Sequence, residues 1–158
     1  MTGSAAPTVV IGVGNPLRRD EGVGPAVVEA LCDRVPHGTV LVVSDGEPAR
    51  LLDLWRDAGL VVLVEALRTR PAAPGRLHTL SAAEAAARTG GTASTHALGL
   101  GETLALAEAL DRLPHRLLVH AMEVADTGLG TGLSEPVRAA LPELVERVAA
   151  AVRHAGNA

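Results

Sequence analysis

The sequence contains no phenylalanine, no tyrosine and no lysine, and it has one tryptophan, Trp55, and one cysteine, Cys32. All fourteen cationic side chains are arginines, and no run of them forms a basic patch in a chain of net charge −4. Because there are almost no aromatic rings to stack on bases either, we expect no nucleic-acid partner. A single cysteine excludes an intrachain disulfide and a cysteine metal cluster, and we expect Cys32 to be a buried filler on a helix.

Long hydrophobic runs are also missing. The apolar run Val9–Val13 is far too short for a signal peptide or a membrane span, and no basic segment precedes it. We therefore expect a cytoplasmic protein without a membrane partner. The chain does contain a globular balance of 47% hydrophobic and 20% charged residues over 158 positions. This predicts a single domain, residues 1–158, with a core of valine, leucine and alanine, and we expect a monomer.

Short apolar runs alternate with amphipathic segments along the chain. The apolar runs predict strands at Thr8–Val13, Thr39–Ser44, Leu60–Val64, Arg76–Leu80 and Arg116–Met122. Helical spacing predicts helices at Pro25–Val35, Ala49–Ala58, Ser81–Arg88, His96–Leu110 and from Ser134 onward, with a flexible loop at Thr89–Ser94. The alternation indicates an α/β fold, a three-layer α/β/α arrangement with a mostly parallel, twisted sheet of about five strands. The polar run near residue 78 is expected to be an antiparallel edge strand.

Polar residues follow several of these predicted strands. The segment from Asn15 to Glu21 follows the first strand, Asp45 follows the second and Glu65 follows the third, while His96 opens a helix after a glycine-bearing loop. Ligands of such a sheet bind beyond the carboxyl ends of its strands, so we expect these groups to converge. Two carboxylates and one imidazole from separate elements can bind a divalent ion and leave positions open. The imidazole favours nickel, zinc, iron or copper over magnesium or calcium.

Each candidate also has a structural interpretation. Glu21 taken alone is more typical of a carboxylate at a helix N-terminus, and Asp45 before a glycine is explained equally well as a turn former. His96 taken alone is more typical of a helix cap or a core position. Glu65 is harder to explain structurally, because a buried strand that ends on an unpaired carboxylate is costly. The convergence of all four, rather than any one of them, indicates a site.

The first loop does not predict a dinucleotide cofactor. The glycines at 12 and 14 do not complete G-x-G-x-x-G, because position 17 is leucine. Asp20 and Glu21 would also repel a pyrophosphate at this place. We therefore expect no cofactor-binding residues of that kind.

The residues from Gly14 to Gly24, GNPLRRDEGVG, resemble the opening signature of the hydrogenase maturation endopeptidases, G-N-x-L-x-x-D-D/E-G-x-G, at every defined position. The resemblance continues over almost the whole chain, through the motifs Asp45-Gly46, Glu65-Ala66, His96–Leu100 and Gly132–Val137. It implies an α/β sheet fold and a peptidase that removes the C-terminal extension of a [NiFe] hydrogenase large-subunit precursor.

The resemblance also implies a metal site with Glu21, Glu65 and His96 as its ligands. The metal is expected to be nickel already loaded into the substrate, and zinc or cadmium can occupy the same site. Asp45 is implied to lie nearby in a supporting or catalytic role, so Glu21 and Asp45 are the catalytic candidates. A Lewis-acid step would polarise the scissile carbonyl or lower the pKa of a bound water, with Asp45 or a metal carboxylate handling the proton.

One residue departs from the family pattern. The family usually has aspartate where this chain has Glu65, and the extra methylene moves the carboxylate by about 1.5 Å. Two alternatives therefore stay open. The chain is either a peptidase or a non-catalytic module that binds the nickel-loaded precursor through an altered site. A peptidyl-tRNA hydrolase-like esterase also begins with a strand and G-x-G-N-P, but that resemblance stops at Pro16.

Overall fold

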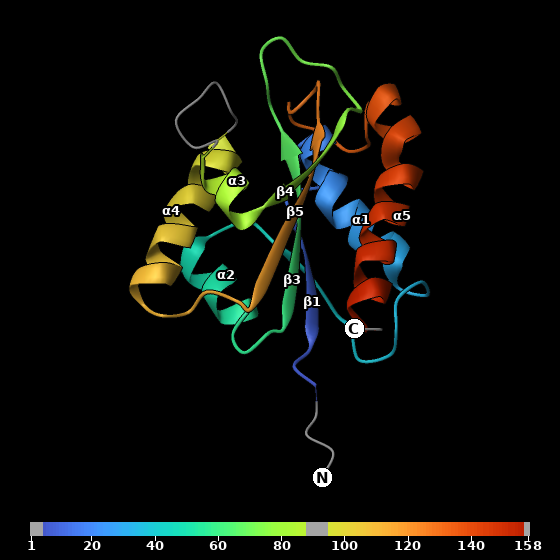
Figure 1. Cartoon of the computed structure of the whole chain (residues 1–158). Coiled ribbons are helices and arrows are strands. Elements are labelled where there is room, and N and C mark those ends of the chain that lie inside the picture. The colour runs from blue at the N-terminus through green and yellow to red at the C-terminus, as the bar shows by residue number, and fades with distance from the viewer. Residues whose placement is uncertain (1–4, 88–94, 157–158) are drawn as a thin grey trace.

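Five strands form one sheet in the computed structural model, which describes residues 5–87 and 95–156, without the side chains of 95–99 (Figure 1). The strands are β1 (Thr8–Val13), β2 (Val40–Ser44), β3 (Leu60–Leu67), β4 (Leu77–Ser81) and β5 (Arg116–Glu123). Their order is β2-β1-β3-β5-β4, and only the β4–β5 pair is antiparallel. The predicted fold class is confirmed, including the antiparallel edge strand. The predicted loop at 89–94 lies outside the described residues.

Helices cover both faces of the sheet. One face carries α1 (Val23–Leu31) and α5 (Glu135–Gly156), and the other carries α2 (Pro48–Leu54), α3 (Ala82–Ala87) and α4 (Thr95–Ala109), as Figure 1 shows. A short 3-10 helix, η1 (Arg19–Gly22), precedes α1. No helix in the described part of the chain is long and apolar enough to cross a membrane.

Two apolar clusters fill the space between the sheet and its helices. Valine and leucine supply most of both clusters, as expected for a chain without phenylalanine or tyrosine. Trp55 is the one large aromatic ring, and it lies in the cluster on the α2, α3 and α4 side with 1% of its surface exposed. Its indole N–H donates to the carbonyl of Arg112 at 3.0 Å, so the buried polar atom of the ring is satisfied.

Two expectations about local structure are corrected. β3 continues to Leu67, so Glu65 lies inside this strand rather than just after it. The extension follows from β5, because Glu65 pairs with Ala121 and Leu67 pairs with Glu123 in parallel register. Cys32 is exposed at the end of α1 and is not a buried filler.

Close backbone contact draws α1 and η1 onto the carboxyl ends of the central strands. A Cβ atom at Gly24 would lie 2.6 Å from the carbonyl oxygen of Val13 and 2.8 Å from that of Val64. Gly14, with a φ of 149°, has a backbone conformation that other residues rarely adopt. A Cβ atom there would lie 1.9 Å from the Glu21 carbonyl oxygen. These glycines are therefore needed to bring Glu21 close to the end of β3.

Candidate functional site

The carboxyl ends of β1 and β3 lie side by side where the chain reverses its direction across the sheet. From β1 the chain crosses to β2 on one side, and from β2 it returns past β1 to β3 on the other side. A doubly wound sheet binds its ligands in the crevice that such a reversal opens. Since η1 contacts β3, the segment carrying Glu21 and the strand carrying Glu65 meet at this crevice, which we call the mouth.

Glu65 is a buried carboxyl group, 7% exposed, with no hydrogen-bond or ion-pair partner among the described residues. Burial raises its pKa from 4.5 to about 7, because the ionised form is disfavoured away from water. It borders a cavity of about 20 Å³ whose other walls are apolar, namely Leu67, Leu80, Ala85, Leu100, Val119 and Ala121. An unpaired carboxyl group in such surroundings costs stability. Glu65 is therefore better explained by a functional role than by packing.

His96 lies in the first turn of α4, and its side chain is outside the described part of the structure. Leu100, about one helical turn later, lines the same small cavity as Glu65. The first turn of α4 and Glu65 thus lie at the same end of the molecule (Figure 1). Among the described side chains, no three histidine, cysteine, aspartate or glutamate groups are clustered closely enough to hold a metal ion. The ligand set of Glu21, Glu65 and His96 stays a prediction.

The two catalytic candidates differ in exposure. Glu21 is 9% exposed within η1, where its N–H donates to the carbonyl of Arg18 at 3.1 Å. Asp45 is exposed after β2, and its Oδ1 accepts the N–H of Glu47 at 3.0 Å, which is the local bond of a turn-forming aspartate. β1 separates the strands of Asp45 and Glu65, so two strand spacings of about 5 Å lie between them. The structure therefore places Glu21 at the mouth and Asp45 at its rim.

An open groove of about 490 Å³ adjoins η1, between α1 and the edge strand β2. Most of the side chains along it are apolar, among them Pro16, Ala26, Val28, Val43 and Leu133. Leu17, the residue after Pro16, is 61% exposed although its side chain is large and apolar. An apolar groove with exposed apolar neighbours is typical of a surface that binds a peptide or a protein.

Asp20 is a buried acid at the mouth that was not among the predicted site residues. Its Oδ2 accepts the N–H groups of Ala125 and Asp126 at 3.1 and 3.0 Å and the hydroxyl of Ser134 at 2.7 Å, and its Oδ1 accepts the Ser134 N–H at 2.7 Å. Burial raises the pKa of Asp20, but the hydrogen bonds from Asp126, Ser134 and Ala125 outweigh this and bring it below 3.8. Asp20 therefore ties η1 to the segment after β5.

Glu123, the last residue of β5, is a second buried acid that was missed. Its Oε1 accepts the Thr69 hydroxyl at 2.6 Å and the Ala73 N–H at 3.1 Å, and its Oε2 lies 2.8 Å from the His78 Nε2. Burial raises its pKa, but the hydrogen bonds from Thr69, His78 and Ala73 lower it to about 2 overall. Glu123 therefore holds the loop between β3 and β4 in place.

Replacing Glu123 by glutamine is expected to lower the free energy of unfolding at pH 7 by about 2 kcal/mol, because charge-assisted hydrogen bonds to the loop are lost. The wild-type carboxylate has a folded pKa of about 2 against an ordinary value of 4.5, so its stabilisation is present above pH 4.5 and is lost as the pH falls through 2. Urea titrations from pH 2 to pH 7 should show a smaller acid-dependent loss for E123Q. Glu108→Gln, an exposed acid on α4, is the matched control and should behave as the wild type.

These features first define a class of protein. The chain is a doubly wound α/β protein that gathers buried acidic residues at the carboxyl ends of its parallel strands, beside an apolar groove. The hydrogenase maturation protease family matches residues 25–151, a range that begins just after the Gly14–Gly24 motif. The chain belongs to this family, and its activity is that of an endopeptidase, a hydrolase acting on peptide bonds.

Individual relatives agree with this assignment. The Escherichia coli hydrogenase 2 maturation protease is 29% identical over 150 residues, which are 94% of this chain and 92% of that protein. The hydrogenase expression/formation protein HupM of Azotobacter chroococcum is 32% identical over 145 residues, 89% of this chain and 69% of its own length. The solved structure of the hydrogenase maturating endopeptidase HybD from Escherichia coli superposes with a TM-score of 0.81 at 28% identity, over 95% of this chain and 94% of that one.

Proposed function

We propose that this endopeptidase removes the C-terminal extension of a [NiFe] hydrogenase large-subunit precursor after nickel has been loaded into it. The observation that carries the proposal is Glu65, a buried carboxyl group without a described partner, at the mouth that η1 and α4 also reach. Such a group is available to a ligand that arrives with the substrate. We expect the reaction to take place in the cytoplasm, with the enzyme as a monomer and without a membrane or nucleic-acid partner.

The chemistry of the proposed donor set fits a nickel ion. Glu21 and Glu65 supply carboxylate oxygens and His96 supplies an imidazole, which suits nickel or zinc better than magnesium. A low-polarity wall around Glu65 also favours pairing of its carboxylate with a cation. We propose that these three side chains hold the substrate-borne nickel, and that zinc or cadmium can bind there in its absence.

The proposed roles of the residues follow from their surroundings. Nickel bound beside the scissile bond would polarise its carbonyl group or activate a water. Glu21, at the mouth, is close to the apolar groove where the peptide would lie, since Gly22 lines that groove. We propose that Glu21 or Asp45 accepts the proton of the attacking water. The exposed carboxylate of Asp45 can do so from the rim, once the turn bond to Glu47 is released.

Cleavage of a matched precursor, with and without nickel, tests this proposal. We expect the purified protein to shorten the nickel-loaded precursor, as seen by mass spectrometry, and to act at least about 100-fold more slowly on the nickel-free precursor. This size is expected because a Lewis acid stabilises the transition state by several kcal/mol. Each 1.4 kcal/mol or so changes the rate about tenfold.

A truncated precursor that already lacks the extension is the control, and it should remain unchanged. Equal cleavage of the nickel-loaded and nickel-free precursors would contradict the proposed role of nickel. Tight binding of the precursor without any cleavage would instead favour the non-catalytic module.

A further inference from the structure

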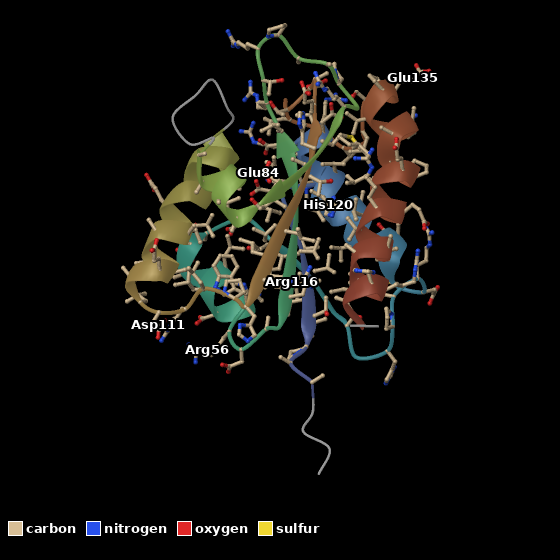
Figure 2. The ribbon with its side chains drawn as sticks, in the orientation of Figure 1. Arg56, Glu84, Asp111, Arg116, His120 and Glu135 are labelled. Carbon is tan, nitrogen blue, oxygen red and sulfur yellow. The ribbon has the colours of Figure 1, made fainter. Side chains whose placement is uncertain are left out.

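The loop between β3 and β4, residues 68–76, is the most basic segment of the molecule for its length. Its sequence, RTRPAAPGR, holds Arg68, Arg70 and Arg76 and no acidic residue, in a chain whose net charge is −4. All three arginines are exposed. Figure 2 shows nitrogen-tipped side chains along this loop, at the end of the molecule where the parallel strands finish. The loop therefore presents positive charge beside the mouth.

Two of these arginines have no side-chain partner among the residues that the structure describes. Arg76 lies 3.8 Å from the buried carboxylate of Glu123, but Arg68 and Arg70 make no hydrogen bond or ion pair with any described residue. By contrast, the two arginines of the first loop are engaged, since Arg19 pairs with Asp126 at 3.6 Å and Arg18 donates to the Thr127 carbonyl at 3.3 Å. Arg68 and Arg70 are thus two adjacent positive charges at the mouth without a side-chain partner in the described part of the chain.

The loop that carries them is held in place from within. Glu123 accepts hydrogen bonds from Thr69 and Ala73, and its backbone also bonds to that of Gly75 at 2.8 Å and of Arg76 at 2.9 Å. Thr69 lies between the two free arginines, so their backbone positions are fixed before any partner arrives. Fixing a loop beforehand reduces the entropy that binding has to overcome.

The loop also begins close to the proposed catalytic centre. Arg68 follows Leu67 directly and is three residues after Glu65, so about 10 Å of extended chain separates them. The start of the loop therefore lies within about 10 Å of the group that the bound peptide is proposed to reach.

Resting on the proposed function, we propose that Arg68 and Arg70 form a docking site for an acidic segment of the protein substrate, next to the bond that is cut. Planar guanidinium groups suit carboxylate partners, because they can bind both oxygens at once. Nucleic acid is the less suitable partner, since the chain is acidic overall and its one aromatic ring, Trp55, is buried. The attraction between the loop and an acidic segment raises the rate of productive encounter and weakens as salt is added.

The test is cleavage of the precursor by the double variant R68E/R70E at low and high salt. At low ionic strength we expect KM to rise at least about tenfold, with a smaller effect on kcat, because electrostatic steering changes association rates by that order or more. At about 1 M salt, where screening acts over roughly 3 Å, the difference from the wild type should largely disappear. Arg116→Glu is the matched control, because the Arg116 side chain is exposed and has no partner among the described residues, but Arg116 begins β5 at the opposite end (Figure 2).

Several outcomes would overturn the docking site. One is an unchanged KM in R68E/R70E, and another is an equal rise of KM in the R116E control. The third is that R68E/R70E no longer binds a single-stranded DNA 20-mer while its KM for the precursor stays normal. Failure of the wild type to cleave would count against the proposed function instead. In that case the docking site is tested by calorimetry of association with the uncleaved precursor. Loss of that association in R68E/R70E but not in R116E supports the docking site.

Discussion

Replacing Glu65 by glutamine is expected to lower the rate of precursor cleavage by at least about 100-fold while the protein stays folded. Glutamine fills the same space in the small apolar cavity but cannot provide a carboxylate to a metal ion. Gel separation of the precursor and its product measures the loss directly. Glu65→Asp is the matched control, because it keeps the charge and has the residue usual in the family, and it should retain most of the activity.

Stability measurements on the metal-free E65Q protein show whether a loss of activity comes from the missing carboxylate or from unfolding. The folded pKa of Glu65 is about 7 against an ordinary value of 4.5, so its contribution to stability is fully present below pH 4.5 and is lost as the pH rises through 7. For a pKa shift of this size, the free energy of unfolding of the wild type falls by about 3 kcal/mol over this pH range. E65Q should therefore be at least as stable as the wild type at pH 8. Full cleavage activity in E65Q would remove Glu65 from the mechanism.

Replacing Asp20 by alanine is expected to lower the free energy of unfolding by about 4 kcal/mol, because three N–H groups and a hydroxyl lose a charged acceptor inside the protein. For a chain of this size that corresponds to about 8–16 °C in Tm, measurable by circular dichroism. The pKa of Asp20 lies below 3.8, so the stability that it supplies is present above pH 3.8 and is lost on acidification beyond it.

Two further variants show whether the effect belongs to the carboxylate. Asp20→Asn keeps the volume and one acceptor oxygen, so its loss should fall between the wild type and D20A. Glu135→Ala removes an exposed acid from the start of α5 at the same end of the molecule, and it should change Tm little (Figure 2). A Tm for D20A equal to that of E135A would show that the four hydrogen bonds add nothing to stability.

The sequence predicts the layers of the fold well, because its strands are short valine-rich runs separated by helical spacing. Such runs are typical of parallel strands buried on both faces, and all five were found within a few residues. The end of β3 was missed for a physical reason. A glutamate after LVVLV looks like the end of a strand, yet pairing with β5 carries the strand two residues past it.

The site was only partly predictable. Glu21 and Glu65 were expected at the mouth and the backbone brings them there, whereas Asp45 lies at the rim. Asp20 and Glu123 were not recognised, because their partners lie far away in the sequence, more than 100 residues for Asp20 and 45 to 54 residues for the side chains bound by Glu123. Adjacent acids in one motif thus have different outcomes, since Asp20 is an anchor between η1 and the segment after β5, whereas the catalytic role of Glu21 stays a prediction.

The buried indole of Trp55 gives this chain a built-in optical reporter. Since there is no tyrosine, ultraviolet emission comes from this ring alone, without energy transfer from tyrosine side chains. The ring directly follows α2, and its N–H donates to the carbonyl of Arg112, near the amino-terminal ends of the strands and away from Glu65. Its emission therefore reports on the packing between the sheet and α2, and we expect a metal bound at the opposite end to change it little.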